Sequence, residues 1–336
     1  MGLIRRHGVR FALGTAATVA FLILFLREVD LGEAWTQMRE LPGWALLASL
    51  GLILVNLTAM TVRWGLLLEG AGHTVGFRQL FATVAMGRAA NNVLPARGGD
   101  LLRIESLRET EGVPVFVTAG TLFAERLMDG VVFAAWIMLG ALLVGNGGIP
   151  LLTGIALSAG VTLGVILCWI AARHPEGTER FLWRVSRRLP GRWHTRVARA
   201  GANFVEGLGA FAGARRFLLV LGTSAVMWLA DVAMFAVVGH AFGLDLETGA
   251  YFLLEGIGNL ALAVPTTAAG LGSFDYITLL TAKHVDISAE TASAYVITMH
   301  ALIVVPITLL GACLVRPALP RLFRGGRKGT AAEQQS

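Results

Sequence analysis

Long apolar runs separated by short polar connectors extend along almost the whole chain. Six runs predict membrane-spanning helices, since about 20 apolar residues cross the hydrocarbon core of a bilayer. They cover residues 11–29, 43–68, 114–144, 150–172, 217–242 and 291–315. The first run lacks a small-residue cleavage site, which favours an uncleaved span over a signal peptide. Residues 30–41 predict a short amphipathic helix at the membrane surface.

Two further apolar segments, 78–110 and 249–284, are interrupted by proline and glycine. Residues 91–103 read NNVLPARGGDLLR and residues 259–275 read NLALAVPTTAAGLGSFD. Both follow the order Asn, apolar residues, Pro, small residues, glycines and Asp. Broken backbone at membrane depth must be covered by protein or line a polar space. We therefore predict two re-entrant helical hairpins, while separate crossings of the membrane by these segments stay an open alternative.

The distribution of charge predicts an orientation. Basic residues gather at the N-terminus, over residues 173–216 and in the C-terminal tail, whereas the connectors near residues 30–33 and 245–247 are acidic. Because cytoplasmic loops are enriched in Lys and Arg, these basic segments and both termini are expected in the cytoplasm. The two broken segments then enter from opposite sides of the membrane.

This arrangement predicts an inverted repeat. Repeat A covers about 43–144 and repeat B about 217–315, and they are linked by the span at 150–172 and the basic loop at 173–216. Asp100 precedes Glu125 by 25 residues and Asp275 precedes His300 by 25 (125 − 100 and 300 − 275). Inverted repeats with broken helices are common in alternating-access transporters. The alternative is that two such breaks occur by chance.

Composition supports an all-α integral membrane protein with about six full spans and two broken hairpins. The chain is 55% hydrophobic and 15% charged, whereas soluble domains are nearer a quarter charged. We expect one membrane domain over residues 1–316 and a disordered basic and polar tail at 317–336. The net charge is +6, and the basic residues lie in segments that flank the spans. They therefore indicate membrane topology and contact with anionic lipid instead of nucleic-acid binding.

The segment 173–216 is the most hydrophilic part of the chain. It holds ten Arg and three acidic residues, with Trp183 and Trp193 interspersed. Helical spacing over residues 178–204 predicts a helix on the membrane surface that binds anionic lipid; contact with a partner enzyme is the alternative. Cys168 and Cys313 lie inside apolar segments, so neither a disulfide nor a metal site is expected.

Polar residues inside the predicted spans and hairpins form the candidate lipid-binding site. On insertion scales a charged side chain costs about 2.5–3.5 kcal/mol at the bilayer centre, so these residues are expected to face the protein interior. The candidate residues are Arg97, Asp100, Arg103, Glu125, Arg126, Asp129, Asn259, Asp275 and His300.

Arg97 and Arg103 follow the first break, where a helix N-terminus would offer free N–H groups. Guanidinium groups and such N–H groups suit a phosphate. Asp100 is expected either as the N-cap of that helix or as the i+3 partner of Arg103. A basic loop that only fixes orientation is the alternative.

In the span at 114–144, Arg126 reaches Asp129 at i+3. Arg126 is expected to meet an anionic headgroup, with Glu125 as counter-charge or proton carrier; a purely structural buried ion pair is the alternative. His300 could titrate near physiological pH and couple transport to protons, or simply bond a neighbouring helix.

Further interior polar groups are Asn56, Asp231, Glu255 and Tyr276. Two more arginines, Arg63 and Arg88, are expected near the cytoplasmic side, where they extend to the surface or contact a headgroup.

Three motifs in order resemble the lysylphosphatidylglycerol synthase transmembrane domain family, whose members are called flippase-like and include proteins linked to hopanoid and glycolipid pathways. The motifs are LPARGGDLLR at 94–103, ERLMD at 125–129 and PTTAAGLGSFD at 265–275. The resemblance covers about residues 10–315. Asp100 and Asp275 stand where the family more often has Glu. Bifunctional members carry a soluble synthase domain after the membrane part, and the resemblance here implies only the lipid-handling half.

The function predicted is a flippase-type transporter of a polar or anionic lipid in the bacterial cytoplasmic (inner) membrane. Alternatives are a non-transporting subunit that docks a separate lipid-modifying enzyme, and an intramembrane transferase that uses Glu125 or Asp275. Motifs for hydrolases, metalloproteases and nucleotide binding are absent, so an enzyme is not expected. We expect no cofactor and no metal. The expected partners are membrane lipids, with an enzyme partner or a homodimer left open.

Overall fold

The computed structural model describes residues 19–27, 31–94, 98–145, 148–187, 190–262 and 270–325, and within these ranges the regular structure is entirely helical. Five of the helices are long and apolar enough to cross a membrane. They are α3 (Gly43–Gly70), α6 (Val115–Leu143), α7 (Gly148–Arg173), α10 (Ala214–Ala241) and α13 (Ala289–Gly325). The predicted all-α membrane fold is thus confirmed. Only part of the first predicted span lies within the described residues. In that part, residues 19–26 are helical.

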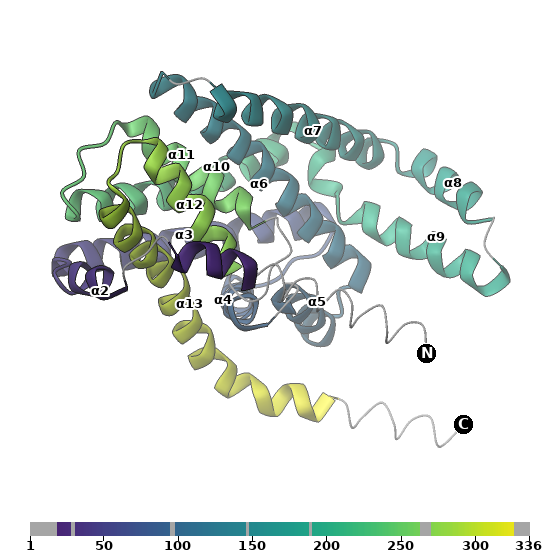
Figure 1. Cartoon of the computed structure of the whole chain (residues 1–336). Helices are drawn as coiled ribbons and strands as arrows, with labels where there is room; N and C mark the ends of the chain where they lie inside the picture. The colour runs from purple at the N-terminus through teal and green to yellow at the C-terminus, as the bar shows by residue number, and fades with distance from the viewer. Residues whose placement is uncertain are drawn as a thin grey trace.

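Proline marks where several helices begin. Pro42 and Pro114 stand immediately before α3 and α6, and Pro190 stands before α9 (Gly191–Glu206). Proline lacks an N–H, which the first turn of a helix does not need, and its fixed φ suits a helix start. The surface segment, predicted as one helical stretch, is therefore two helices, α8 (Pro175–Ser186) and α9. In Figure 1 they lie side by side and extend beyond the rest of the bundle.

Each broken segment is a pair of packed helices. The first pair is α4 (Phe77–Val93) with α5 (Gly98–Glu111), and the second is α11 (Thr248–Ala261) with α12 (Ser273–His284). The breaks at 95–97 and 263–269 lie outside the described residues. At the start of α12, Gly270 and Gly272 have φ of 73° and 84°. Glycine adopts this left-handed conformation without steric penalty, which explains the glycines after the second break.

The two hairpins join the bundle at opposite ends. Helices α3 and α10 pack antiparallel: Asn56 bonds Asp231, while Gly70 lies against Ala210, just before α10. Hairpin α4–α5 follows the C-terminal end of α3, and hairpin α11–α12 follows the C-terminal end of α10 (Figure 1). Because α3 and α10 run in opposite directions, the hairpins enter from opposite ends. Whether the two halves are related as an inverted repeat stays a prediction.

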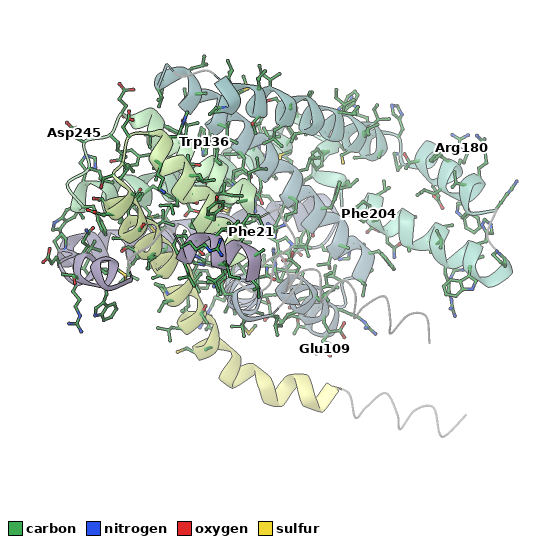
Figure 2. The ribbon with its side chains drawn as sticks, viewed as in Figure 1. Phe21, Glu109, Trp136, Arg180, Phe204 and Asp245 are labelled. Atoms are coloured by element: carbon green, nitrogen blue, oxygen red, sulfur yellow. The ribbon has the colours of Figure 1, made fainter. Side chains whose placement is uncertain are left out.

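The two ends of the bundle differ in charge. One end carries the start of α10, the end of α3 and the arginine-rich α8–α9 pair, and the other carries the loop with Asp245 and Glu247. In Figure 2 the labelled Arg180 and Asp245 lie at opposite edges of the molecule. We refer to these as the basic end and the acidic end.

The outer surface is apolar, as a lipid-facing surface must be. Helix α7 has few buried residues, and Leu152, Leu163 and Leu167 on it are exposed. Short helix α2 (Leu31–Arg39), predicted as a surface helix, exposes Trp35, on whose ring the Arg39 guanidinium stacks at 4.9 Å. A 3₁₀ turn, η2 (Gly209–Ala212), links α9 to α10. Helix α13 continues to Gly325, so residues 317–325 of the predicted tail are helical.

Candidate functional site

An alternating chain of six charged side chains runs through the interior near the first hairpin. Its members, in order of contact, are Arg103, Glu125, Arg63, Asp129, Arg126 and Asp100. They come from α3, α5 and α6. Three guanidinium groups and three carboxylates balance in charge, which reduces the free-energy cost of placing ions away from water. We call this set the ion-pair chain.

Arg103 closes one end of the chain and is fully covered. Its Nη1 and Nη2 atoms donate to the two carboxylate oxygens of Glu125 at 2.9 and 3.0 Å, a bidentate pair. Its guanidinium also stacks on the Trp64 ring at 4.0 Å. The expectation that Arg103 pairs with Asp100 at i+3 is wrong, because the Arg103 side chain crosses to α6. The bidentate pair with Glu125 holds α5 against α6, and the stacking on Trp64 holds α5 against α3.

Asp129 is the most connected carboxylate of the chain. Its Oδ1 atom accepts hydrogen bonds from Arg63 at 2.5 Å and from the Trp228 indole at 2.8 Å, and its Oδ2 accepts from Arg126 at 3.3 Å. The predicted i+3 pair of Arg126 and Asp129 is therefore present. Arg63 also donates to Ser224 at 3.2 Å and is completely buried, so it does not extend to the membrane surface as expected. Asp129 thus joins α6 to α3 and α10.

Asp100 and its neighbours hold the start of α5 against α4. The Asn91 side chain accepts from the Gly99 N–H at 2.8 Å and donates to Asp100 at 3.2 Å. Gly99 packs so closely on α4 that a Cβ there would collide with the backbone of Gly87. Because α5 begins at Gly98, Asp100 lies in its first turn and its carboxylate faces Arg126 at 3.5 Å; it is not the N-cap.

Among the described arginines of the interior, Arg126 and Arg88 are the most open to a ligand. Arg126 keeps 37% of its side chain exposed, although its neighbours Glu125 and Asp129 on α6 are buried. Arg88 on α4 is partly buried, and among the described residues its side chain has no hydrogen bond or ion pair. The positive charge of Arg88 interacts electrostatically with the Asp231 carboxylate on α10, and Asp231 is also partly accessible. An anion entering here would meet two cations with free hydrogen-bonding capacity.

The second hairpin carries its own polar contacts. His300 Nδ1 lies 2.5 Å from an Asp275 oxygen, and the other Asp275 oxygen accepts the Gly272 N–H at 2.9 Å. Asn259 donates to Glu255 on the same helix at 3.2 Å. Among the described residues, none of these contacts reaches the ion-pair chain. The predicted site residues in the described part of the chain are therefore divided among the ion-pair chain, the Asp275–His300 pair and the Asn259–Glu255 pair.

Sequence reasoning located most of these residues but not their partners. Arg97 lies outside the described residues. The sequence does not point to Trp64 or Trp228 as site residues. Asn91 could have been noticed, because it begins the first of the two similar stretches that lead into the breaks. No local spacing could have identified the two tryptophans, which come from other helices.

Two hollows in the surface lie away from the ion-pair chain. One, about 540 Å³, is bounded by the end of α3 and by α7, α8, α9 and η2 at the basic end. The other, about 390 Å³, lies between α2, α10 and the start of α13 at the acidic end. Among the described residues no group of His, Cys, Asp and Glu is suited to a metal ion.

The fold and site define a polytopic α-helical membrane protein with two helical hairpins and a charged interior next to the first of them. The chain belongs to the family described as the Lysylphosphatidylglycerol synthase TM region, which matches residues 11–311. It is 26% identical to a UPF0104 membrane protein of Methanothermobacter thermautotrophicus over 76% of this chain and 78% of that protein.

A second relative carries an enzyme name. The chain is 25% identical to Glycosyltransferase AglD of Haloferax volcanii over 87% of this chain. The match spans only 52% of AglD, so about half of that protein has no counterpart here. These similarities support a role connected with membrane lipids.

Proposed function

We propose that this protein is a flippase-type transporter that moves a polar or anionic lipid between leaflets. The observation that carries the proposal is the pair of accessible guanidinium groups, Arg126 and Arg88, inside a bundle entered by hairpins from opposite ends. Buried arginines are expensive in a membrane protein and mark substrate paths. The apolar tails would stay in the bilayer while the headgroup passes between the hairpins.

In this proposal the ion-pair chain has two parts with different tasks. Arg103 and Arg63 are covered and paired, so they hold α3, α5 and α6 together. Arg126 exchanges its long contacts to Asp100, at 3.5 Å, for shorter contacts to the phosphate of the lipid. Releasing Asp100 then loosens the first turn of α5, which links headgroup binding to movement of that helix.

For the orientation, we place the basic end in the cytoplasm, which puts the C-terminal end of α13 there too. The N-terminal residues lie outside the described part of the chain and are assigned to the same side only by their arginines. The lipid gradient, the membrane potential or protons would supply the drive.

A proteoliposome assay tests the proposal. Purified protein is reconstituted with lipids that carry a fluorescent acyl chain, and loss of fluorescence after adding an impermeant quencher reports movement between leaflets. Headgroups are varied with the acyl chains kept constant: phosphatidylglycerol, phosphatidylethanolamine and a neutral glycolipid. We expect movement of at least one phosphate-bearing lipid, slowed at least tenfold in Arg126→Gln and Arg88→Gln.

The matched control is Arg108→Gln, which removes an exposed arginine whose partner is Glu105 on the same helix. This variant should move lipid at the wild-type rate. If no headgroup moves, or if Arg126→Gln and Arg88→Gln both behave like Arg108→Gln, the transport proposal is wrong.

A second function is a membrane subunit that docks a separate lipid-modifying enzyme. It is favoured by the enzyme name of the relative AglD and by the α8–α9 pair, which extends beyond the rest of the bundle (Figure 1) and exposes Phe181, Val185 and Trp193. Copurification from the native membrane tests it: a stoichiometric enzyme partner that is lost in Phe181→Ser/Trp193→Ser supports docking. A second copy of the chain in the same experiment would indicate a homodimer.

A further inference from the structure

Two glutamates of the membrane interior are equally buried but differ completely in their partners. Glu125 and Glu255 both have no exposed surface. Glu125 receives two hydrogen bonds from Arg103 and lies 3.8 Å from Arg63. Glu255, on α11, receives only the side-chain amide of Asn259 on one oxygen, and its second oxygen has no hydrogen-bond partner.

Among the described residues, the charged groups that act on Glu255 are all acidic. Helix α11 packs against α6, α10 and α12. The charged groups that act on Glu255 are carboxylates, Asp231 from α10 and Asp129 from α6. From α12 the nearby polar group is the Thr278 hydroxyl, which faces Gly258 one turn along α11. Among the described residues Glu255 therefore has no cation within ion-pair distance.

Burying an ionised carboxylate without a counter-ion costs several kcal/mol, which is more than protonating it costs near neutral pH. Two acidic neighbours increase this cost. The surroundings of Glu255 therefore favour a neutral carboxylic acid, whereas Glu125 faces the guanidinium group of Arg103 in the ion-pair chain.

The packing of α11 determines when Glu255 can lose its proton. A Cβ added at Gly256 would lie 2.9 Å from Ile137 on α6, and one at Gly258 would lie 2.7 Å from the Thr278 hydroxyl. These close approaches pack α11 tightly against α6 and α12, and the Glu255 side chain has no exposed surface. Water or a cation can reach Glu255 only if α11 moves away from the helices that pack against it. Asp231, one of the two carboxylates that act on Glu255, is partly accessible.

We propose that Glu255 is a proton-binding site that takes up one proton when the second hairpin closes and releases it when the hairpin opens. In chemical terms the step is Glu255–COOH giving Glu255–COO⁻ and a hydrated proton on the side to which the hairpin opens. No other group is oxidised, reduced or transferred. Because movement of the hairpin and ionisation require each other, they are linked thermodynamically. The inference rests on the proposed lipid transport, for which it supplies the coupling ion.

The first experiment detects the proton without transport. Dicyclohexylcarbodiimide reacts with protonated carboxyl groups in apolar surroundings: the acid proton passes to a carbodiimide nitrogen, the carboxylate oxygen adds to the central carbon, and rearrangement leaves a stable N-acylurea. Reconstituted protein is treated at several pH values and digested, and the modified peptide is identified by mass spectrometry. We expect modification at Glu255 and not at Glu125, decreasing as the pH is raised.

The second experiment measures coupling in the proteoliposome assay. For one proton per cycle, a gradient of one pH unit shifts the steady-state lipid distribution up to about tenfold. Wild-type protein should show this shift. Glu255→Gln keeps the shape and the Asn259 contact but cannot ionise, so it should move lipid without responding to the gradient. Glu255→Asp should restore part of the response, and Glu105→Gln, on an exposed side chain, should respond like wild type.

The results separate the two proposals. Lipid movement that ignores the pH gradient in wild-type protein leaves flipping intact and overturns the coupling. Labelling at Glu125 in preference to Glu255 overturns the proton site directly, even if Glu255→Gln does not fold. Absence of any lipid movement refutes the transport proposal, and the labelling result then decides by itself whether Glu255 binds a proton.

Discussion

Replacing Glu125 by Gln should be among the most destabilising single changes in the membrane interior. Glu125 accepts two hydrogen bonds from Arg103 and neutralises its charge, and it also forms an ion pair with Arg63 at 3.8 Å. The substitution leaves three guanidinium groups facing two carboxylates, so one buried positive charge has no counter-charge. Removing one partner of a buried ion pair costs about 3–5 kcal/mol, and we expect Glu125→Gln to fall in this range.

A double-mutant cycle tests the cause of the effect. Arg103→Met alone removes the opposite charge and leaves Glu125 with only the longer contact to Arg63, so it too should cost about 3–5 kcal/mol. The double variant Arg103→Met/Glu125→Gln restores neutrality, since Arg63, Asp129, Arg126 and Asp100 still alternate. Its cost should be smaller than the sum of the single costs by about 2 kcal/mol or more.

The free energy of unfolding can be measured by titrating the protein in mixed micelles with sodium dodecyl sulfate and following far-ultraviolet circular dichroism. The pair Arg108 and Glu105, whose side chains are 59% and 49% exposed, provides the control cycle. Exposed pairs contribute about 0–1 kcal/mol. Strictly additive costs in the Arg103–Glu125 cycle, or a Glu125→Gln cost no larger than that of Glu105→Gln, would refute the reasoning.

Three further predictions concern the first hairpin and its supports. Gly99→Ala should displace α5 from α4, because the added methyl group collides with Gly87, and should lower the thermal stability of the protein clearly. Trp228→Phe keeps an aromatic ring, although a smaller one, and removes the indole N–H that donates to Asp129, so it should cost about 1–3 kcal/mol in the same titration. Asn92→Ala removes two hydrogen bonds to α13, at 3.0 and 3.3 Å, so it should let α4 and α13 move apart. The measurement is the yield of chemical cross-links between these two helices, which should decrease.

Two of these changes, Gly99→Ala and Trp228→Phe, have a matched comparison. Gly43→Ala introduces the same methyl group at a helix position with nothing within 4 Å, and it should be neutral. For the tryptophan, Trp193→Phe on the exposed face of α9 serves the same purpose. Equal effects of the test and control substitutions would show that the contacts described do not matter for stability.

Local rules predicted the elements well and the pairings unevenly. The i+3 pair of Arg126 and Asp129 is present, because both side chains project from one helix face and their distance follows from helix geometry alone. The same rule applied to Asp100 and Arg103 failed. Arg103 instead reaches Glu125, 22 positions away, because α5 lies against α6 and offers a bidentate partner. Spacing within one helix carries no information about which neighbouring helix competes for a side chain.

The equal separations of 25 residues illustrate the same limit. Asp275 and His300 are in direct contact, whereas Asp100 contacts Arg126, the residue beside Glu125. Spacing brought the correct helices together in both halves. The choice between Glu125 and Arg126 depended on charge, since two carboxylates repel and a carboxylate attracts a guanidinium.

The sequence by itself determined that this is a helical membrane protein, where its long helices lie, and that two segments are broken, because hydropathy and the backbone properties of proline and glycine act locally. It also determined that charges lie in the interior. Only the tertiary structure decided which charges neutralise one another, leaving Arg88 without a hydrogen-bonded partner and Glu255 without a cation among the residues that the structure describes. Ion pairing away from water depends on the distances between helices that are far apart in sequence, and these distances exist only once the helices have packed.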